Sequence, residues 1–393
     1  MGEKIKFLHI VGPDTKNSYG IMSQIHKTQN MDEHRFLITS YESSRDRFPK
    51  LQEFEDNFFV PENCPWPRRL RRLWYFYRTL SRAEVLIWHS LYFTTQKYVW
   101  FLFFFQKLLK KSVWVEWGAD LYLWEFPDVS LKNKLKNYIN RRIRQEFRFI
   151  GVTFPVDSLE YERQFGNAVR CFYTPMPNPY HGASEQIDII LATRPAKKKW
   201  ERVTVQVAHN AFTFNNHFYL LNVLKKFKDE NMHLVVPLSY GMYGINGQFG
   251  SKNYCNAVKK FAKSIFPDKV SVLCKGIPFD RYLELLWNID IAVFDFDRPC
   301  GLGTLRILVL MEKKIFLPAG SPYFDFLVSR GLPICDTNKI AEMSYEEFIA
   351  PVTYADQDWV YDYMNNDCVM KNWNDMFEEL EKIFGLDHGK GTK

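Results

Sequence analysis

Residues 289–305, IDIAVFDFDRPCGLGTL, contain an apolar run, a glycine-rich turn and the beginning of a second apolar segment, in that order. The run over 289–296 has the length of a buried strand, and residues 301–311 fit a helix that begins with glycine. A strand that leads directly into a helix is the repeating unit of parallel α/β sheets. This stretch therefore predicts an α/β fold.

The same alternation extends toward both ends of the chain. Strands are predicted at 5–11, 35–40, 58–60, 85–89, 113–117, 148–153 and 170–173, and again at 203–208, 233–237, 270–273, 289–296 and 314–318. The helices predicted between them include 19–27, 98–105, 131–149, 217–228, 253–266, 280–287 and 301–311. Strands that alternate with helices indicate right-handed βαβ units around a parallel sheet.

A break in this alternation divides the chain into domains. Residues 174–200 contain four prolines and a basic run, which is typical of a linker. We therefore predict an N-terminal α/β domain over 1–174, a linker over 175–200, a C-terminal α/β domain over 201–350 and a helical tail over 351–393 that packs across both. Ligands of open α/β sheets bind beyond the carboxyl ends of the strands, so we expect the site in a cleft between the domains.

The overall composition is that of a globular protein, with 46% hydrophobic and 25% charged residues. Seven scattered cysteines without a CxxC pair argue against a disulfide framework or a structural zinc site, so we expect a reduced, cytoplasmic protein. The first residues, MGEKIKFLHIVGPD, lack the apolar core of a signal peptide. The apolar run YVWFLFFF at 98–105 is eight residues long and too short to span a bilayer, so we expect a buried helix there.

Charge is distributed unevenly along the chain. Residues 1–200 hold 31 Lys/Arg against 21 Asp/Glu, a net +10, whereas residues 201–393 hold 21 against 24, a net −3. Residues 65–82 carry six arginines interleaved with aromatic residues. Arg68, Arg69, Arg71 and Arg72 of this stretch fit an anionic membrane surface. They would also suit nucleic acid, or simply a solvated basic face.

A second basic stretch covers residues 131–149. It has apolar residues at helical spacing, which predict one apolar stripe facing inward: Leu131, Leu135, Tyr138, Ile139, Ile143 and Phe147. The remaining faces, from Lys132 to Arg148, are basic, so the membrane and solvated-face interpretations apply here too.

The turn PCGLGTL at 299–305 lies between a strand and a helix, where glycines let the backbone approach a ligand. The free N–H groups of the helix N-terminus favour phosphate, and Thr304 and Arg306 add a hydroxyl and a cation. Gly301 and Gly303 are therefore candidate phosphate-binding residues, with a tight packing turn as the alternative. The sequence matches neither GxGxxG nor the Walker loop.

Two further loops of the C-terminal domain follow predicted strands. AHNAFTFNNH at 208–217 offers three asparagines and two histidines as hydrogen-bonding groups, with N-capping of the next helix by Asn215 or Asn216 as the alternative. In VVPLSYG at 235–241, Tyr240 suits either stacking on a base or closing the loop.

Candidate general bases follow the strands of the N-terminal domain: Asp120 and Glu116 in VWVEWGADLY (113–122), His89 and Asp14. Each is also suited to an N-cap or an internal hydrogen bond. Asp295 and Asp297 form a DxD pattern that a strand would point to one face, but we expect no metal and no cofactor. No zinc-protease or serine-hydrolase motif is present.

Together, EWGADLY (116–122), AHNAFTFNNH, VVPLSYG and RPCGLGTL (298–305) resemble glycosyltransferase family 56. This family comprises the TDP-N-acetylfucosamine:lipid II N-acetylfucosaminyltransferases (4-acetamido-4,6-dideoxy-D-galactose transferases) of enterobacterial common antigen synthesis. The resemblance follows nearly the whole chain in order. It implies site residues in the first domain (His9, Asp14, Trp117, Gly118, Asp120 and Tyr122) and in the second (Asn210, Asn216, His217, Gly301, Gly303 and Thr304).

The resemblance also implies a GT-B-like pair of Rossmann-type domains facing across a cleft, with the donor held mainly by the second. We therefore expect a glycosyltransferase that moves a (4-amino-4,6-dideoxy)hexose from a dTDP-sugar to an undecaprenyl-pyrophosphate-linked saccharide in bacterial surface polysaccharide synthesis. It would be peripheral, at the cytoplasmic face of the inner membrane. The alternative is a basic nucleic-acid-binding protein or a non-catalytic membrane-peripheral scaffold. Neither explains the polar loops of the net acidic second domain, so we expect no nucleic-acid partner.

Overall fold

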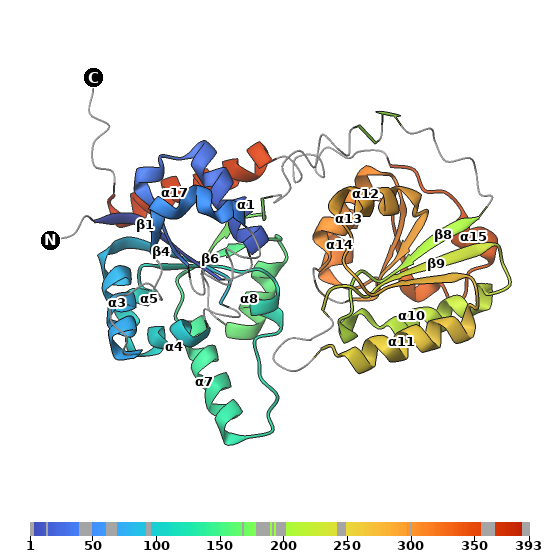
Figure 1. Ribbon diagram of the computed structural model, residues 1–393, viewed down its shortest axis with the longest axis horizontal. Coiled ribbons are helices and arrows are strands. Elements are labelled where there is room, and N and C mark those ends of the chain that lie inside the picture. The colour runs from blue at the N-terminus through green and yellow to red at the C-terminus, as the bar shows by residue number, and fades with distance from the viewer. Residues whose placement is uncertain are drawn as a thin grey trace. The chain divides into compact units, whose positions relative to one another are not determined.

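The computed structural model describes residues 4–12, 15–38, 49–59, 69–91, 96–166, 169–177, 189–190, 192–193, 202–241, 249–296, 298, 300–354 and 366–386. The chain forms two compact units (Figure 1). One unit combines Met1–His181 with Tyr363–Lys393, and the other is Gly182–Asp362. Each unit is built around its own parallel sheet.

The first unit contains a seven-stranded sheet in the order β3-β2-β1-β4-β5-β6-β7, with every pairing parallel. Its strands are β1 (Ile5–Val11), β2 (His34–Ile38), β3 (Phe58–Phe59), β4 (Ala83–His89), β5 (Ser112–Val115), β6 (Phe149–Val152) and β7 (Arg170–Tyr173). The central strands are buried on both faces, which their nearly continuous apolar sequences require.

Helices cover both faces of this sheet. They are α1 (Thr15–Thr28), α3 (Arg69–Arg82), α4 (Gln96–Phe104), α5 (Gln106–Leu109), α6 (Ala119–Tyr122), α7 (Leu131–Gln145), α8 (Asp157–Phe165) and α17 (Asn366–Phe384), with 3-10 turns η1 (Met31–Glu33) and η2 (Pro49–Asn57). One core packs the sheet against α1 and α17, and the other packs it against α3, α4, α7 and α8.

The C-terminal helix α17 belongs to the first unit, although it is the last element of the chain. Trp373, Met376, Phe377 and Leu380 are buried in the core that also contains Phe7 and Val11 of β1. The indole N–H of Trp373 donates to the carbonyl of Pro175 at 2.9 Å. The predicted helical tail therefore forms, and the packing of its described residues is within this unit.

The second unit contains a six-stranded parallel sheet in the order β10-β9-β8-β11-β12-β13. Its strands are β8 (Val203–Val207), β9 (Met232–Pro237), β10 (Val270–Leu273), β11 (Ile291–Val293), β12 (Lys314–Leu317) and β13 (Ile334–Asp336). Its helices are α10 (His217–Leu224), α11 (Lys252–Ile265), α12 (Phe279–Asn288), α13 (Leu302–Leu310), α14 (Pro322–Ser329) and α15 (Tyr345–Ile349), with η5 (Thr213–Asn215), η6 (Lys225–Phe227) and η7 (Thr337–Lys339).

The structure confirms the α/β prediction, and it corrects two details. The strand predicted at 289–296 ends at Val293, so Asp295 lies in the following loop. The expectation that a strand would point both acids of the DxD pattern to one face therefore does not apply. The stripe predicted to face inward over 131–149 does so only from Ile139 onward. Ile139 packs against the core and Ile143 and Phe147 are buried in it, whereas Leu131, Leu135 and Tyr138 are exposed. Among the described residues, no helix is long and apolar enough to cross a bilayer.

Candidate functional site

The loop after β8 is held together by the side chain of Asn210. Its Oδ1 accepts from the backbone N–H of Phe212 at 2.9 Å and from Nδ2 of Asn215 at 2.7 Å. Its Nδ2 therefore faces His209 and donates to Nε2 of that ring at 2.7 Å. Since Nε2 accepts, the proton of the neutral His209 ring lies on Nδ1.

His209 stays neutral because its surroundings oppose a positive charge. Burial, together with the nearby Arg298 and His217, lowers its pKa to about 3. Nδ1 is buried and has no hydrogen-bond partner among the described residues. A buried N–H without a partner carries a desolvation penalty of about 1–3 kcal/mol, which a hydrogen bond to a bound ligand would relieve.

Three more buried polar atoms without a partner in the described part of the chain lie in or beside this loop: Oε1 of Gln206 in β8, Oδ1 of Asn215, and Nε2 of His217 at the start of α10. His217 is also neutral, because burial lowers its pKa to about 4, and its Nδ1 lies 3.0 Å from the hydroxyl of Tyr254. Four such atoms between residues 206 and 217 are more than ordinary packing leaves unsatisfied. They mark the carboxyl end of β8 as a candidate binding site.

The glycine turn lies against this loop. Gly301 has φ +64° and precedes α13 as its N-cap residue, and a Cβ atom built on it would lie 2.9 Å from the ring of His209. Gly303 differs, because a Cβ atom there meets nothing within 4 Å. The hydroxyl of Thr304 lies 2.5 Å from that of Tyr282, and Nε of Arg306 donates to the carbonyl of Leu302 at 3.2 Å. The turn thus brings the N-terminus of α13 next to His209.

Two other predicted residues of this unit lie on adjoining loops. Tyr240 follows β9, is 66% exposed and lies edge-on to Phe212 at 5.7 Å, and its carbonyl accepts from Ala211. Asn216 occupies the N-cap position of α10 but makes no side-chain cap bond, and its Nδ2 donates to the carbonyl of Asp295 at 3.4 Å. The alternative interpretation, simple helix capping by these asparagines, therefore does not describe Asn216.

Three buried histidines form a diagonal line across the first sheet. Nδ1 of His9 lies 2.9 Å from Nε2 of His89, and Nε2 of His9 lies 2.9 Å from Nδ1 of His34. Burial lowers the pKa of His34 and of His89 to about 3, and it lowers that of His9 still more clearly because both neighbours add to the effect. We call His34, His9 and His89 the histidine line.

At the carboxyl end of β4 the histidine line meets Trp117. The two rings lie 6.3 Å apart, and His89 also stacks on Trp373 of α17. Nδ1 of His89 and Nε1 of Trp117 are buried and find no partner among the described residues. The first sheet therefore also presents unsatisfied polar atoms beyond its strands, at two residues that the sequence singled out.

Asp120 and Glu116 hold the turn between β5 and α6. Oδ2 of Asp120 accepts from the backbone of Leu91 at 2.7 Å and from the indole of Trp114 at 2.6 Å, and Oδ1 accepts from the backbone of Trp117 at 2.8 Å. Glu116 accepts from the backbone of Gly118 and from both the N–H and hydroxyl of Thr153. Both carboxylates are fully buried. Burial and the neighbouring acids, Asp157 and Asp120, raise the pKa of Glu116.

The remaining predicted residues are placed as follows. The hydroxyl of Tyr122 donates to Oδ1 of Asp157 at 2.6 Å. Arg69, Arg71 and Arg72 lie on α3, but their side chains are outside the described part of the structure. Asp14, Arg68 and Asp297 lie outside the described residues altogether.

The family model of the 4-alpha-L-fucosyltransferases, glycosyl transferase group 56, matches residues 26–380. The chain belongs to this family. The protein is therefore a glycosyltransferase that moves a sugar from a nucleotide-sugar donor to an acceptor, and the predicted family is confirmed.

Two solved structures are similar in fold to this chain. An alpha,alpha-trehalose 6-phosphate synthase from Burkholderia multivorans is 9% identical, with 100% of both chains covered and a TM-score of 0.59. A glycosyltransferase from Rickettsia africae ESF-5 is 11% identical, with 99% of this chain and 100% of that chain covered and a TM-score of 0.56. These likenesses cover nearly the whole chain and confirm the GT-B-like fold class.

Sequence reasoning missed four polar residues of the glycosyltransferase's candidate sites: Gln206, His209, Asn215 and His34. His209 and Asn215 belong to the loop that was singled out, but their own roles were not assigned. His34 begins β2 and was not noticed, because nothing in the sequence places it beside His9 and His89. The available signal was position along the chain. His34 and His209 flank apolar runs predicted as strands and Gln206 lies within one, whereas Asn215 only precedes the predicted helix at 217–228.

Proposed function

We propose that this glycosyltransferase moves a (4-amino-4,6-dideoxy)hexose from a dTDP-sugar to an undecaprenyl-pyrophosphate-linked saccharide in bacterial surface polysaccharide synthesis. The family description names a fucosyl group, and fucose is a 6-deoxyhexose, which supports the deoxy part of the donor. The observation that carries the donor site is the set of four unpartnered polar atoms between Gln206 and His217, next to the N-terminus of α13.

The donor would be held by three parts of the second unit. The N-terminus of α13 offers free N–H groups and a positive dipole end to the diphosphate, and Thr304 and Arg306 lie in its first turns. Nδ1–H of His209 donates a hydrogen bond to an oxygen of the donor, and the exposed ring of Tyr240 stacks on the base. Charge that develops on the leaving diphosphate is offset by these same groups, which require no metal ion.

The general base would be His89, Asp120, Glu116 or Asp14, and the described contacts support His89 best. A base needs an oxygen or nitrogen free to take the proton of the acceptor hydroxyl. The carboxylates of Asp120 and Glu116 are occupied by backbone donors, which suits a role in shaping the turn that carries Trp117 and Tyr122. Nδ1 of His89 is unoccupied among the described residues, but burial lowers its pKa to about 3, so His89 can act as the base only where the bound acceptor or a neighbouring charge stabilises its protonated form.

The histidine line would set the protonation of His89. If Nε2–H of His89 donates to His9, and His9 in turn donates to His34, Nδ1 of His89 keeps its lone pair and accepts the proton. The first unit would then bind the lipid-linked acceptor, with Trp117 and Tyr122 beside it, at the cytoplasmic face of the inner membrane.

The donor site is tested by a thermal-shift screen of nucleoside diphosphates and nucleotide sugars. A ligand that binds the folded state raises its stability by RT ln(1 + [L]/Kd), so dTDP and dTDP-sugars should raise the melting temperature. His209→Phe keeps the ring and removes the donor, and it should weaken dTDP binding about tenfold, since a hydrogen bond to a charged group contributes ~1.5–3 kcal/mol. His233→Gln, a change outside this loop, is the matched control. Unchanged dTDP affinity in His209→Phe would contradict the donor site.

A further inference from the structure

Helix α7 presents its apolar residues to solvent. Leu131, Leu135 and Tyr138 follow one another at spacings of four and three, which places them in one row along the helix. Their exposed fractions are 85%, 59% and 57%. Val129, just before the helix, is 82% exposed. We call Val129, Leu131, Leu135 and Tyr138 the apolar row.

The opposite side of α7 is polar, and it makes the contacts that hold the helix to the first unit. Nδ2 of Asn133 donates to the carbonyl of Pro127 at 2.7 Å, and Asn137 exchanges two hydrogen bonds with the backbone of Phe126. Oδ1 of Asn140 accepts from the indole of Trp100 at 3.2 Å, and Arg144 donates to the carbonyl of Asp120. These four residues also form one row at helical spacing, about half a turn away from the apolar row.

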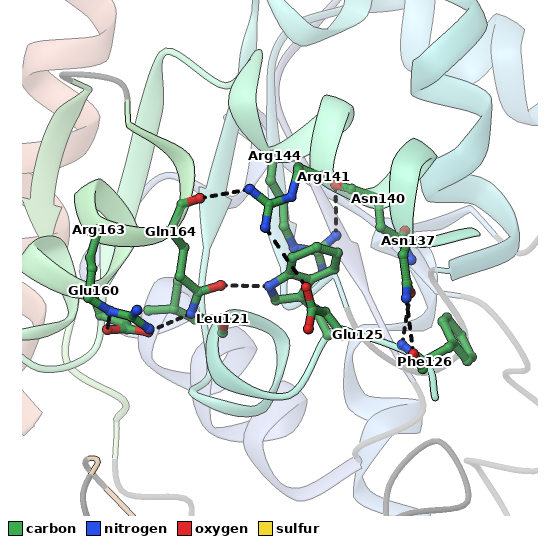
Figure 2. A network of polar contacts seen from close by, with 11 residues as sticks. Leu121, Glu125, Phe126, Asn137, Asn140, Arg141, Arg144, Glu160, Arg163 and Gln164 are labelled. Carbon is green, nitrogen blue, oxygen red and sulfur yellow. Dashed lines mark hydrogen bonds and ion pairs between the residues drawn. The ribbon is translucent and has the colours of Figure 1, made fainter. Parts of the chain in front are cut away.

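Further contacts fix the same side of the helix. Figure 2 shows Arg141 reaching the carbonyl of Gln164 at 3.3 Å, while the side chain of Gln164 accepts from Trp124 and donates to Leu121. The orientation of α7 is therefore determined by this polar network together with the packing of Ile139 and Ile143 on the core, so the apolar row cannot turn inward without breaking both. A surface helix normally buries its apolar stripe, and this one is reversed over its first two turns.

The apolar surface continues onto α4. The ring of Phe103 lies 6.5 Å from that of Tyr138, and Phe104 beside it is 75% exposed. In Figure 1, α7 runs away from the body of the first unit. An exposed apolar surface on a projecting element is typical of an interaction site rather than of a monomer's ordinary surface.

Basic residues surround the apolar row. Residues 125–148 contain seven Lys/Arg, of which only Arg144 is buried, and three Asp/Glu. Lys132 and Lys134 lie beside the row, and Arg142 continues its line at the next helical position. Each of the three acids already pairs with a cation of this segment: Asp128 with Lys134, Glu125 with Arg141, and Glu146 with Arg142. A basic helix with exposed Leu and Tyr matches an anionic bilayer, whose headgroups meet the cations while the apolar side chains enter the acyl boundary.

We propose that the apolar row of α7, with Phe104 of α4, is the surface by which this protein enters an anionic phospholipid bilayer. The surface is assigned on the exposure, orientation and charge of α7 alone. Its purpose, bringing the first unit to a lipid-linked acceptor, rests on the proposed function. The inward row of Asn133, Asn137, Asn140 and Arg144 serves this surface by holding the apolar row outward.

Liposome co-sedimentation tests the surface. The row variant, Leu131→Ser/Leu135→Ser/Tyr138→Ser, removes the three helical side chains of the apolar row and keeps Val129. Its matched control is Leu159→Ser/Ile383→Ser/Val328→Ser, because these three residues are also exposed apolar side chains but lie elsewhere. On vesicles of phosphatidylglycerol and phosphatidylethanolamine, wild type and control should bind alike, and the row variant should bind at least about tenfold more weakly. High salt should weaken wild-type binding without abolishing it, since inserted side chains are not screened.

Stability and donor binding separate this inference from the proposed function. Exposed residues contribute little to folding, so the row variant should keep the wild-type melting temperature and the wild-type shift with dTDP. Equal binding of wild type and row variant, or equal binding of wild type to neutral and anionic vesicles, would overturn the inference. The inference would also be overturned if wild type did not bind vesicles but formed an oligomer that dissociates in the row variant, because the apolar row would then be a protein interface. Absence of any dTDP shift with vesicle binding intact would instead reject the donor proposal alone.

Discussion

Acid should destabilise the first unit through the histidine line. His34, His9 and His89 are all buried on the sheet face that α17 covers, with Trp373 stacked on His89 and Phe377 against His34 and His9. In the unfolded chain each ring binds a proton below pH ~6.5, whereas in the folded state His34 and His89 bind one only near pH 3. The unfolded state therefore takes up more protons between these values, and the free energy of unfolding falls as pH falls through this window.

The magnitude follows from the two pKa values. At pH 5 protonation stabilises each imidazole of the unfolded chain by about 2 kcal/mol, and the folded imidazoles of His34 and His89 gain no such stabilisation. These two residues together therefore lower the free energy of unfolding by ~4 kcal/mol between pH 8 and pH 5. His9 acts in the same direction. A single domain has only about 5–15 kcal/mol of stability, so the loss would be a large part of the total.

The measurement is urea unfolding at pH 8, 6 and 5, for wild type and for His9→Phe/His34→Phe/His89→Phe. Phenylalanine keeps an aromatic ring in each stacked position and removes all three titrations. The wild type should lose ~4 kcal/mol more than the variant between pH 8 and pH 5. Histidines of the second unit titrate in both proteins and cancel in the difference. If the free energy of unfolding fell equally with pH in the two proteins, the reasoning would be refuted, whatever their absolute stabilities.

Three further predictions concern the candidate sites. Gly301→Ala should lower donor kcat/KM at least tenfold, because its φ is +64° and its Cβ would meet His209 at 2.9 Å, while Gly303→Ala, into open space, should leave steady-state kinetics unchanged. Asp120→Asn should lower the melting temperature by several degrees, because the new amide NH₂ would face a backbone or indole N–H donor and leave it unpaired, at a cost of ~1–3 kcal/mol in stability. Loss of kcat with unchanged stability would instead show that Asp120 is the base. Activity should survive EDTA, and its loss with recovery on adding Mn²⁺ or Mg²⁺ would make Asp295 and Asp297 metal ligands.

The sequence alone determined the two sheets and most of their strands. β1 was predicted at its observed bounds, and β4 and β12 within two residues, because strands buried on both faces are continuous apolar runs. The glycine turn and the polar loop after β8 were also evident, since a strand, a turn and a helix follow one another locally. Such features depend on neighbours in the chain, and a linear sequence displays them directly.

Only the tertiary structure decided which polar groups meet. The histidine line joins residues separated by 25 and 80 positions, and no local pattern records that parallel strands place them side by side. The carboxylates of Asp120 and Glu116 have the residue type and position of a base, but only their partners at Leu91 and Thr153 show that they bind the backbone. For the stretch that contains α7 the periodicity was correct, and the predicted direction holds for Ile139, Ile143 and Phe147 but is wrong for Leu131, Leu135 and Tyr138. Both of its rows have helical spacing, and hydrophobicity favours burying the leucines, but the hydrogen bonds of Asn137 and Arg144 to backbone carbonyls turn the polar row inward.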